Sequence, residues 1–147
     1  MQSKLLSEIG GQRSHVLVLA TGEEAMAALQ AFARELSLTA ASFTAIGAFS
    51  NAVLGYFDWT AKSYRRIPVD EQVEVASLTG DIALGPDGAP ALHAHVVLGR
   101  HDGSALAGHL LEGHVRPTLE IVLTESPRHL RKQLDPESGL ALIRPEL

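Results

Sequence analysis

The segment LHAHVVLGRHDGSALAGHL, residues 92–110, constrains the fold more than any other part of the sequence. In the first half, polar His93 and His95 alternate with apolar residues, which is typical of a half-buried β-strand. Between the halves lies the dipeptide Asp102-Gly103, a strong signal for a tight turn between antiparallel strands. The segment therefore predicts a β-hairpin, and the length of its loop decides which side chains share a face.

Two loop lengths fit this turn, and they place the histidines differently. A two-residue loop would turn His109 away from His95. A three-residue loop, with Gly103 in the left-handed conformation, would place these two side chains opposite each other. We expect the three-residue loop, because it alone makes one face wholly apolar and gathers the histidines on the other. The apolar face would then carry Ala94, Val96, Leu98, Leu106, Gly108 and Leu110, and the polar face His93, His95 and His109.

Three imidazoles on adjacent strands suggest a metal site. Directly opposed residues have Cβ atoms about 5 Å apart, close enough for their rings to share one ion. The chain has no cysteine, so a zinc site must use His, Asp or Glu. We therefore predict a divalent ion, with zinc as first choice, at His93, His95 and His109, bound less well below about pH 6. The alternative is that these are ordinary polar side chains on an exposed face.

The rest of the chain predicts one helix followed by a run of strands. In TGEEAMAALQAFARELSL, apolar residues recur at helical spacing, and Thr21 and Glu24 have the spacing of a capping box. Pro68 suits an edge strand, and Gly80 a bulge. Strands are expected at residues 15–22, twice within 39–59 with a bend between, and at 62–69, 72–84 and 114–126; residues 127–147 are expected to form a short helix and a tail.

These elements predict a single α+β domain over residues 1–147. It would be a mostly antiparallel β-sheet packed with one main N-terminal helix and a short C-terminal helix. The first residues lack the apolar stretch of a signal peptide, and no apolar run approaches the roughly 20 residues that cross a bilayer. We therefore expect a cytoplasmic protein without a membrane partner.

Several segments together resemble the plants-and-prokaryotes conserved (PPC) domain. They are TAIGAFSNAVLGYFD, VEVASLTGDIAL, the histidine segment with the strand after it, and LDPESGL, spanning roughly residues 14–140. In land plants this domain follows AT-hooks in nuclear DNA-binding proteins, and in bacteria and archaea it stands alone. The resemblance implies a compact α+β domain assembled as a homotrimer. Bacterial members carry the pattern HxH…GH, matched by His93, His95 and His109, and those histidines are associated with a bound metal.

The chain departs from the plant members in ways that bear on function. It has no AT-hook, and EQVEVA, which corresponds to the plant partner-binding segment Gly-Arg-Phe-Glu-Ile-Leu, clearly matches it only at Glu74. Ala107 replaces the usual second glycine before GH. Glu120, in RPTLEIVL, matches a glutamate common in the family, and it is a candidate fourth ligand, orienting residue or general base. The alternative is a half-buried carboxylate bonded to backbone or to a neighbouring subunit.

Three functions follow as hypotheses. The first is a trimeric regulatory or interaction module with a three-histidine metal site, and self-association also fits Phe49, Tyr56, Phe57 and Trp59, which lie near one bend. The second is a metal-dependent hydrolase or small-ligand binder. The third is a DNA-binding protein, which the formal charge of −5 opposes, since duplex binding rests on Lys and Arg.

Overall fold

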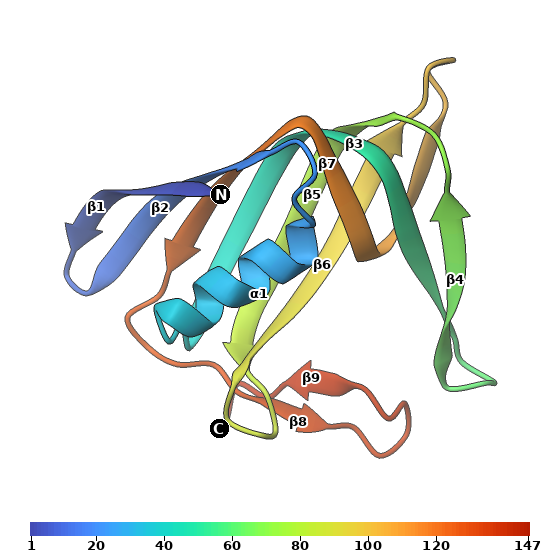
Figure 1. The fold of residues 1–147 in the computed structure, drawn as a ribbon. Helices are drawn as coiled ribbons and strands as arrows, with labels where there is room; N and C mark the ends of the chain where they lie inside the picture. Colours follow the sequence, from blue (N-terminus) through green and yellow to red (C-terminus); the bar gives the residue numbers. More distant parts are fainter.

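The computed structural model describes residues 1–147 and contains one helix and nine strands (Figure 1). Seven strands form an antiparallel sheet in the order β1-β2-β7-β6-β5-β3-β4, and β8 and β9 form a separate two-stranded sheet. The elements are β1 (Gln2–Ile9), β2 (Gln12–Ala20), α1 (Ala25–Glu35), β3 (Ala40–Asp58), β4 (Ser63–Val69), β5 (Val73–Leu84), β6 (Pro90–Gly99), β7 (Ala105–Glu125), β8 (Lys132–Leu134) and β9 (Ala141–Ile143).

The large sheet curls back on itself. Strand β3 pairs with both β5 and β7, so the pairings β7–β6–β5–β3–β7 close a ring. The two expected strands of residues 39–59 are one bent strand, β3, whose register shifts between Ala45 and Gly47. Gly47 has a φ of +153°, and a Cβ there would lie 2.2 Å from the carbonyl oxygen of Thr118. Glycine is therefore required where β3 and β7 approach most closely at the bend.

The core lies between the helix and one face of the sheet. Helix α1 packs across β6 and β7 (Figure 1). It contributes Leu29 and Phe32 to a cluster of 26 buried residues that also includes Leu98, Leu110 and Leu119. Phe49 is fully buried in this cluster, so it does not belong to an exposed aromatic patch as the sequence suggested. Helix α1 is not long and apolar enough to span a membrane.

Helix α1 is capped by Glu24 instead of Thr21. The Glu24 carboxylate accepts hydrogen bonds from the backbone N–H groups of Met26 and Ala27, at 3.0 and 2.7 Å, and from that of Gly113 at 2.9 Å. Thr21 donates its hydroxyl to the carbonyl of Pro117. The longer glutamate side chain reaches both the helix start and β7, and so it ties the two together.

The predicted C-terminal helix is wrong. Residues 132–143 form the hairpin of β8 and β9, because Asp135-Pro136 opens a turn that a helix cannot pass. The Asp135 carboxylate accepts from the backbone N–H and hydroxyl of Ser138, and Gly139 adopts a φ of +75°. Strand β1 was not predicted.

The predicted bulge at Gly80 is also misplaced. The register of β5 shifts between Val75 and Ser77 instead. At Gly80 the ladder is regular, and a Cβ would lie 2.3 Å from the ring of Phe43. This glycine therefore makes room for a core aromatic side chain.

Candidate metal centre

The hairpin of β6 and β7, called the histidine hairpin below, has the three-residue loop. His95 pairs with His109, and Leu98 pairs with Leu106. The backbone N–H of Arg100 donates to the carbonyl of Ser104 at 2.8 Å, and Gly103 has a φ of +82°. The register prediction is therefore confirmed: Ala94, Val96 and Leu98 of β6 face the core, and the histidines lie on the opposite face.

The three histidine rings converge on one point. His93 Nε2 and His95 Nε2 are 3.2 Å apart, and His109 stacks on His93 with ring centroids 5.2 Å apart. One ring nitrogen from each residue lies within 4.8 Å of the others. Two nitrogens that bind one zinc ion tetrahedrally at about 2.05 Å lie about 3.4 Å apart. Small side-chain rotations would therefore bring all three to a common ion.

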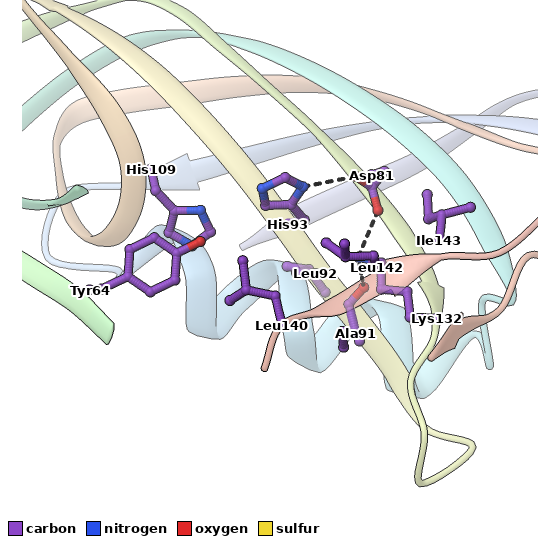
Figure 2. A pocket seen from close by; sticks show the side chains of 11 residues that line it. Tyr64, Asp81, Ala91, Leu92, His93, His109, Lys132, Leu140, Leu142 and Ile143 are labelled. Carbon is purple, nitrogen blue, oxygen red and sulfur yellow. Dashed lines mark hydrogen bonds and ion pairs between the residues drawn. The ribbon is translucent and has the colours of Figure 1, made fainter. Parts of the chain in front are cut away.

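Asp81 and Lys132 hold His93 in place. The Asp81 Oδ2 atom lies 3.3 Å from His93 Nδ1, and Lys132 Nζ lies 2.7 Å from Asp81 Oδ1 (Figure 2). With Nδ1 donating to the carboxylate, His93 keeps Nε2 unprotonated and turned toward His95. Carboxylates commonly orient metal-binding histidines in this way, so the contact fits a metal ligand.

The electrostatics of the site keep the rings of His95 and His109 neutral and Asp81 charged. Burial lowers the pKa of His95 and brings that of His109 to about 4, with the neighbouring histidines adding to both shifts. Burial alone would raise the pKa of Asp81, but the hydrogen bond with His93 and the ammonium of Lys132 outweigh it, so the pKa lies below its ordinary value. At neutral pH, His95 and His109 therefore present the unprotonated nitrogens that metals bind.

His109 has an unpartnered nitrogen. Its Nδ1 atom is buried and has no hydrogen-bond partner in the chain. Figure 2 shows a nitrogen of this ring on the side that faces His93. A buried polar atom without a partner costs free energy, which a bound ion or ligand would recover. This observation also fits a metal at the cluster.

A cavity of about 330 Å³ lies beside the cluster (Figure 2). His93 and His109 border it on the sheet side, together with Asp81 and Tyr64. The hairpin of β8 and β9, called the C-terminal hairpin below, lies across the opposite side. It contributes Lys132, Leu140, Ala141, Leu142 and Ile143 to the lining.

Glu120 lies outside this group. Its side chain is exposed and borders a separate hollow with Ile46 and Glu74. The histidine cluster contains no carboxylate ligand from β7. Within one chain, Glu120 is therefore not placed to act as a fourth ligand, and a role toward another subunit stays a prediction.

The other histidines do not join the cluster. His101 lies in the hairpin loop with 82% of its side chain exposed. His15 is buried with its ring against Phe32, and burial lowers its pKa.

The sequence analysis missed Asp81, Tyr64 and Lys132. Asp81 pairs directly with His93 across β5 and β6, so pairing those two strands across the Gly85–Pro90 turn would have found it. Tyr64 packs its ring 4.6 Å from that of His109 from the edge strand β4. No local pattern marks Lys132, which reaches the site from a distant part of the chain.

The chain is similar to known proteins over nearly its whole length. The model of the Plants and Prokaryotes Conserved (PCC) domain matches residues 6–127. A plant- and prokaryote-conserved protein of Pyrococcus horikoshii is 32% identical, with a TM-score of 0.84 over 97% of this chain and 94% of that one. No curated protein matches the chain.

Two further solved structures have names that bear on function. A metal-containing protein of Archaeoglobus fulgidus is 32% identical, with a TM-score of 0.81 over 98% of this chain and 99% of that one. A candidate DNA-binding protein of Bacteroides thetaiotaomicron is 30% identical, with a TM-score of 0.87 over 99% of both chains.

Proposed function

The chain belongs to the Plants and Prokaryotes Conserved (PCC) domain family, and on that premise we propose that it is a cytoplasmic, homotrimeric interaction module that holds one divalent metal ion per chain. His93, His95 and His109 are the proposed ligands, and zinc is the first candidate because neutral imidazoles suit it. The observation that carries the proposal is the convergence of three ring nitrogens within 4.8 Å. The metal-containing relative from Archaeoglobus fulgidus supports it.

The exposed side chains of the sheet support self-association. Ile46, Val97 and Val122 are 62%, 39% and 49% exposed on the face that α1 does not cover. Tyr56 and Trp59, near the tip of the β3–β4 hairpin, are 65% and 54% exposed. Large apolar side chains grouped on a sheet face are typical of protein interfaces. We therefore propose that copies of the chain cover one another there.

Native mass spectrometry of untagged protein, combined with metal analysis, tests both parts of the proposal. We expect a complex of three chains carrying one metal ion per chain. A species of one chain at micromolar concentration would exclude the trimer. A preparation that stays below about 0.1 equivalents of zinc, nickel, copper or iron after dialysis against each would exclude the metal site.

A small-ligand binder or a metal-dependent hydrolase is the second candidate, and the cavity beside the cluster favours it. A divalent ion held by three histidines keeps a coordination position for a ligand oxygen or a water. The cavity of about 330 Å³ would give such a ligand room at His93 and His109. Saturation of the loaded protein with a small ligand would distinguish this candidate from a module that binds only proteins.

We also propose that the chain does not bind duplex DNA, although its relative from Bacteroides thetaiotaomicron is named as a DNA-binding protein. A trimer would triple the formal charge of −5. Five of the 12 Lys and Arg side chains are already paired with carboxylates, namely Arg13, Arg66, Arg100, Lys132 and Arg144. Titration of a labelled duplex at about 50 mM salt tests this, because electrostatic binding is strongest at low salt. Submicromolar affinity that falls steeply with salt would overturn it.

A further inference from the structure

We propose that the cavity between the histidine cluster and the C-terminal hairpin binds a small organic anion, a carboxylate with a short aliphatic body. The inference rests on the proposed metal site and adds the class of ligand. Three features of the cavity carry it: its charge, its free hydrogen-bond donors and its apolar walls.

The charge of the cavity favours an anion once the metal is bound. The carboxylate of Asp81 and the ammonium of Lys132 neutralise each other at 2.7 Å. The histidine rings that border the cavity, His93 and His109, would coordinate the ion as neutral ligands. A divalent ion therefore leaves an excess of about two positive charges at the edge of a partly enclosed space. Without the metal, the excess disappears.

Lys132 keeps a donor for the ligand. Its side chain is only 5% exposed, and it lines the cavity. Its ammonium forms an ion pair with Asp81 Oδ1 at 2.7 Å, and one N–H donates to the carbonyl of Ala91 at 3.3 Å. An ammonium has three N–H groups, so at least one remains for a ligand. Tyr64, which also lines the cavity, adds a second donor through its phenol hydroxyl.

The other residues that line the cavity favour a ligand with an apolar part. Seven of the 11 lining residues are hydrophobic, among them Leu140 and Leu142 of the C-terminal hairpin and Leu92 of β6. At about 30 Å³ per water-sized atom, 330 Å³ holds roughly ten non-hydrogen atoms. Inorganic phosphate would use the charge but leave these walls in contact with water. A short fatty or branched-chain carboxylate would use both features.

The experiment begins with the zinc content of the full chain, so that the premise is tested first. If zinc does not bind stoichiometrically, the proposed function fails and this inference falls with it. If zinc binds, calorimetric titration of the loaded protein compares butanoate, acetate, butanamide and inorganic phosphate. Butanamide has the shape of butanoate without its charge, and acetate has the charge without two methylenes.

We expect butanoate to bind about tenfold more tightly than acetate, because each buried methylene contributes about 0.8 kcal/mol. Butanoate should also bind at least tenfold more tightly than butanamide and phosphate, and at least tenfold less tightly to the metal-free chain. Equal affinities for butanoate and acetate would mean that carboxylates bind only the metal, and they would overturn the inference while the metal site stands. Equal affinities for butanoate and butanamide would also overturn it.

Two matched variants of the C-terminal hairpin locate the ligand. Leu140→Trp fills the apolar end of the cavity and should remove the advantage of butanoate over acetate while zinc is retained. Leu134→Trp makes the same change at a side chain that is 60% exposed and lies outside the lining, and it should bind as the unaltered chain does. A zinc-loaded Leu140→Trp variant that keeps the full advantage would place the anion elsewhere. If that variant does not fold, the ligand series on the unaltered chain decides alone.

Discussion

The histidine hairpin and the C-terminal hairpin border the same cavity but are held in place differently. The histidine hairpin buries Val96, Leu98 and Leu110 in the core. The C-terminal hairpin has strands of three residues, leaves Leu134 60% exposed, and buries the charged side chain of Lys132. Hydrophobic burial therefore fixes the hairpin that carries the metal ligands. Polar contacts attach the hairpin that closes the cavity, namely the ion pair of Lys132 with Asp81, its hydrogen bond to Ala91, and the backbone bridge between Leu84 and Arg131. The free energy of unfolding should depend mainly on the histidine hairpin, whereas the C-terminal hairpin should adjust the metal affinity of the site.

The largest expected difference between the hairpins is in stability. Leu98→Ala should lower the free energy of unfolding by about 3 kcal/mol, because Leu98 is fully buried and its loss leaves a cavity. Leu134→Ala should change it by less than about 0.5 kcal/mol. Urea unfolding, followed by tryptophan fluorescence and circular dichroism, measures both values. Equal losses would mean that the C-terminal hairpin is as much a part of the core as the histidine hairpin.

Metal affinity should depend on one face of the histidine hairpin only. His95→Ala should weaken zinc binding at least about 100-fold, since two of three protein ligands remain. It should leave the metal-free fold intact, because His95 lies on the face away from the core. His101→Ala, in the loop of the same hairpin, is the control and should bind zinc normally. Competition with a chromophoric chelator gives both affinities, and normal binding by His95→Ala would exclude the proposed ligand set.

The same contrast explains how much of the molecule the sequence predicts. The histidine hairpin was predictable because a one-residue slip would bury its histidines and expose its apolar side chains. That constraint is local, so it can be followed in the residues on either side of Asp102-Gly103. The helix was predictable because its apolar residues also follow a local pattern. The carboxylate of its cap, Glu24, additionally accepts a hydrogen bond from the backbone N–H of Gly113 on a distant strand.

Other parts were not predictable because long-range contacts decide them. The C-terminal residues have too few apolar positions to impose a period, and the turn at Asp135-Pro136 outweighs their helix-forming side chains. Lys132 enters the site only after that hairpin docks against β6. Strand β1 is entirely exposed and forms by pairing with β2, so no pattern of burial marks it.

Breaking the link between the two hairpins should cause a moderate loss of metal affinity. Asp81→Asn removes the charge that connects Lys132 to His93. We expect zinc to bind about tenfold more weakly, the lower end of the effect of losing a partner that orients a metal ligand. Asp87→Asn, in the turn between β5 and β6, is the control, since its side-chain oxygen still accepts from the N–H of Ala89. The same chelator competition applies, and an unchanged affinity in Asp81→Asn would show that His93 does not need this carboxylate.

The smallest expected effect is the pH dependence of the metal-free protein. His109 faces His93 and His95 of β6, Tyr64 of β4 and Lys132 of β8, and its pKa of about 4 lies well below the ordinary histidine value of 6.5. The unfolded chain therefore binds more protons than the folded chain between these values, so stability is complete above about pH 6.5 and falls as the pH drops toward 4. Burial lowers the pKa of His95 and His15 as well, which adds to the same slope.

The carboxylates with lowered pKa values, Glu23, Asp81, Asp102 and Asp135, act in a different window, below their ordinary values of 4.5 for Glu23 and 3.8 for the aspartates. Between pH 7 and pH 5 the histidines should therefore set most of the slope. With allowance for the partial exposure of His109, we expect the free energy of unfolding to fall by about 1 kcal/mol across that interval.

In His109→Gln the fall should be clearly smaller, because the group with the largest pKa shift is gone. Urea unfolding at both pH values measures the change, and an equal slope in the variant would mean that protons at the histidine hairpin do not control stability. Saturating zinc should preserve or steepen the slope in the unaltered chain, since the ion keeps protons off the folded histidines while the unfolded chain still takes them up.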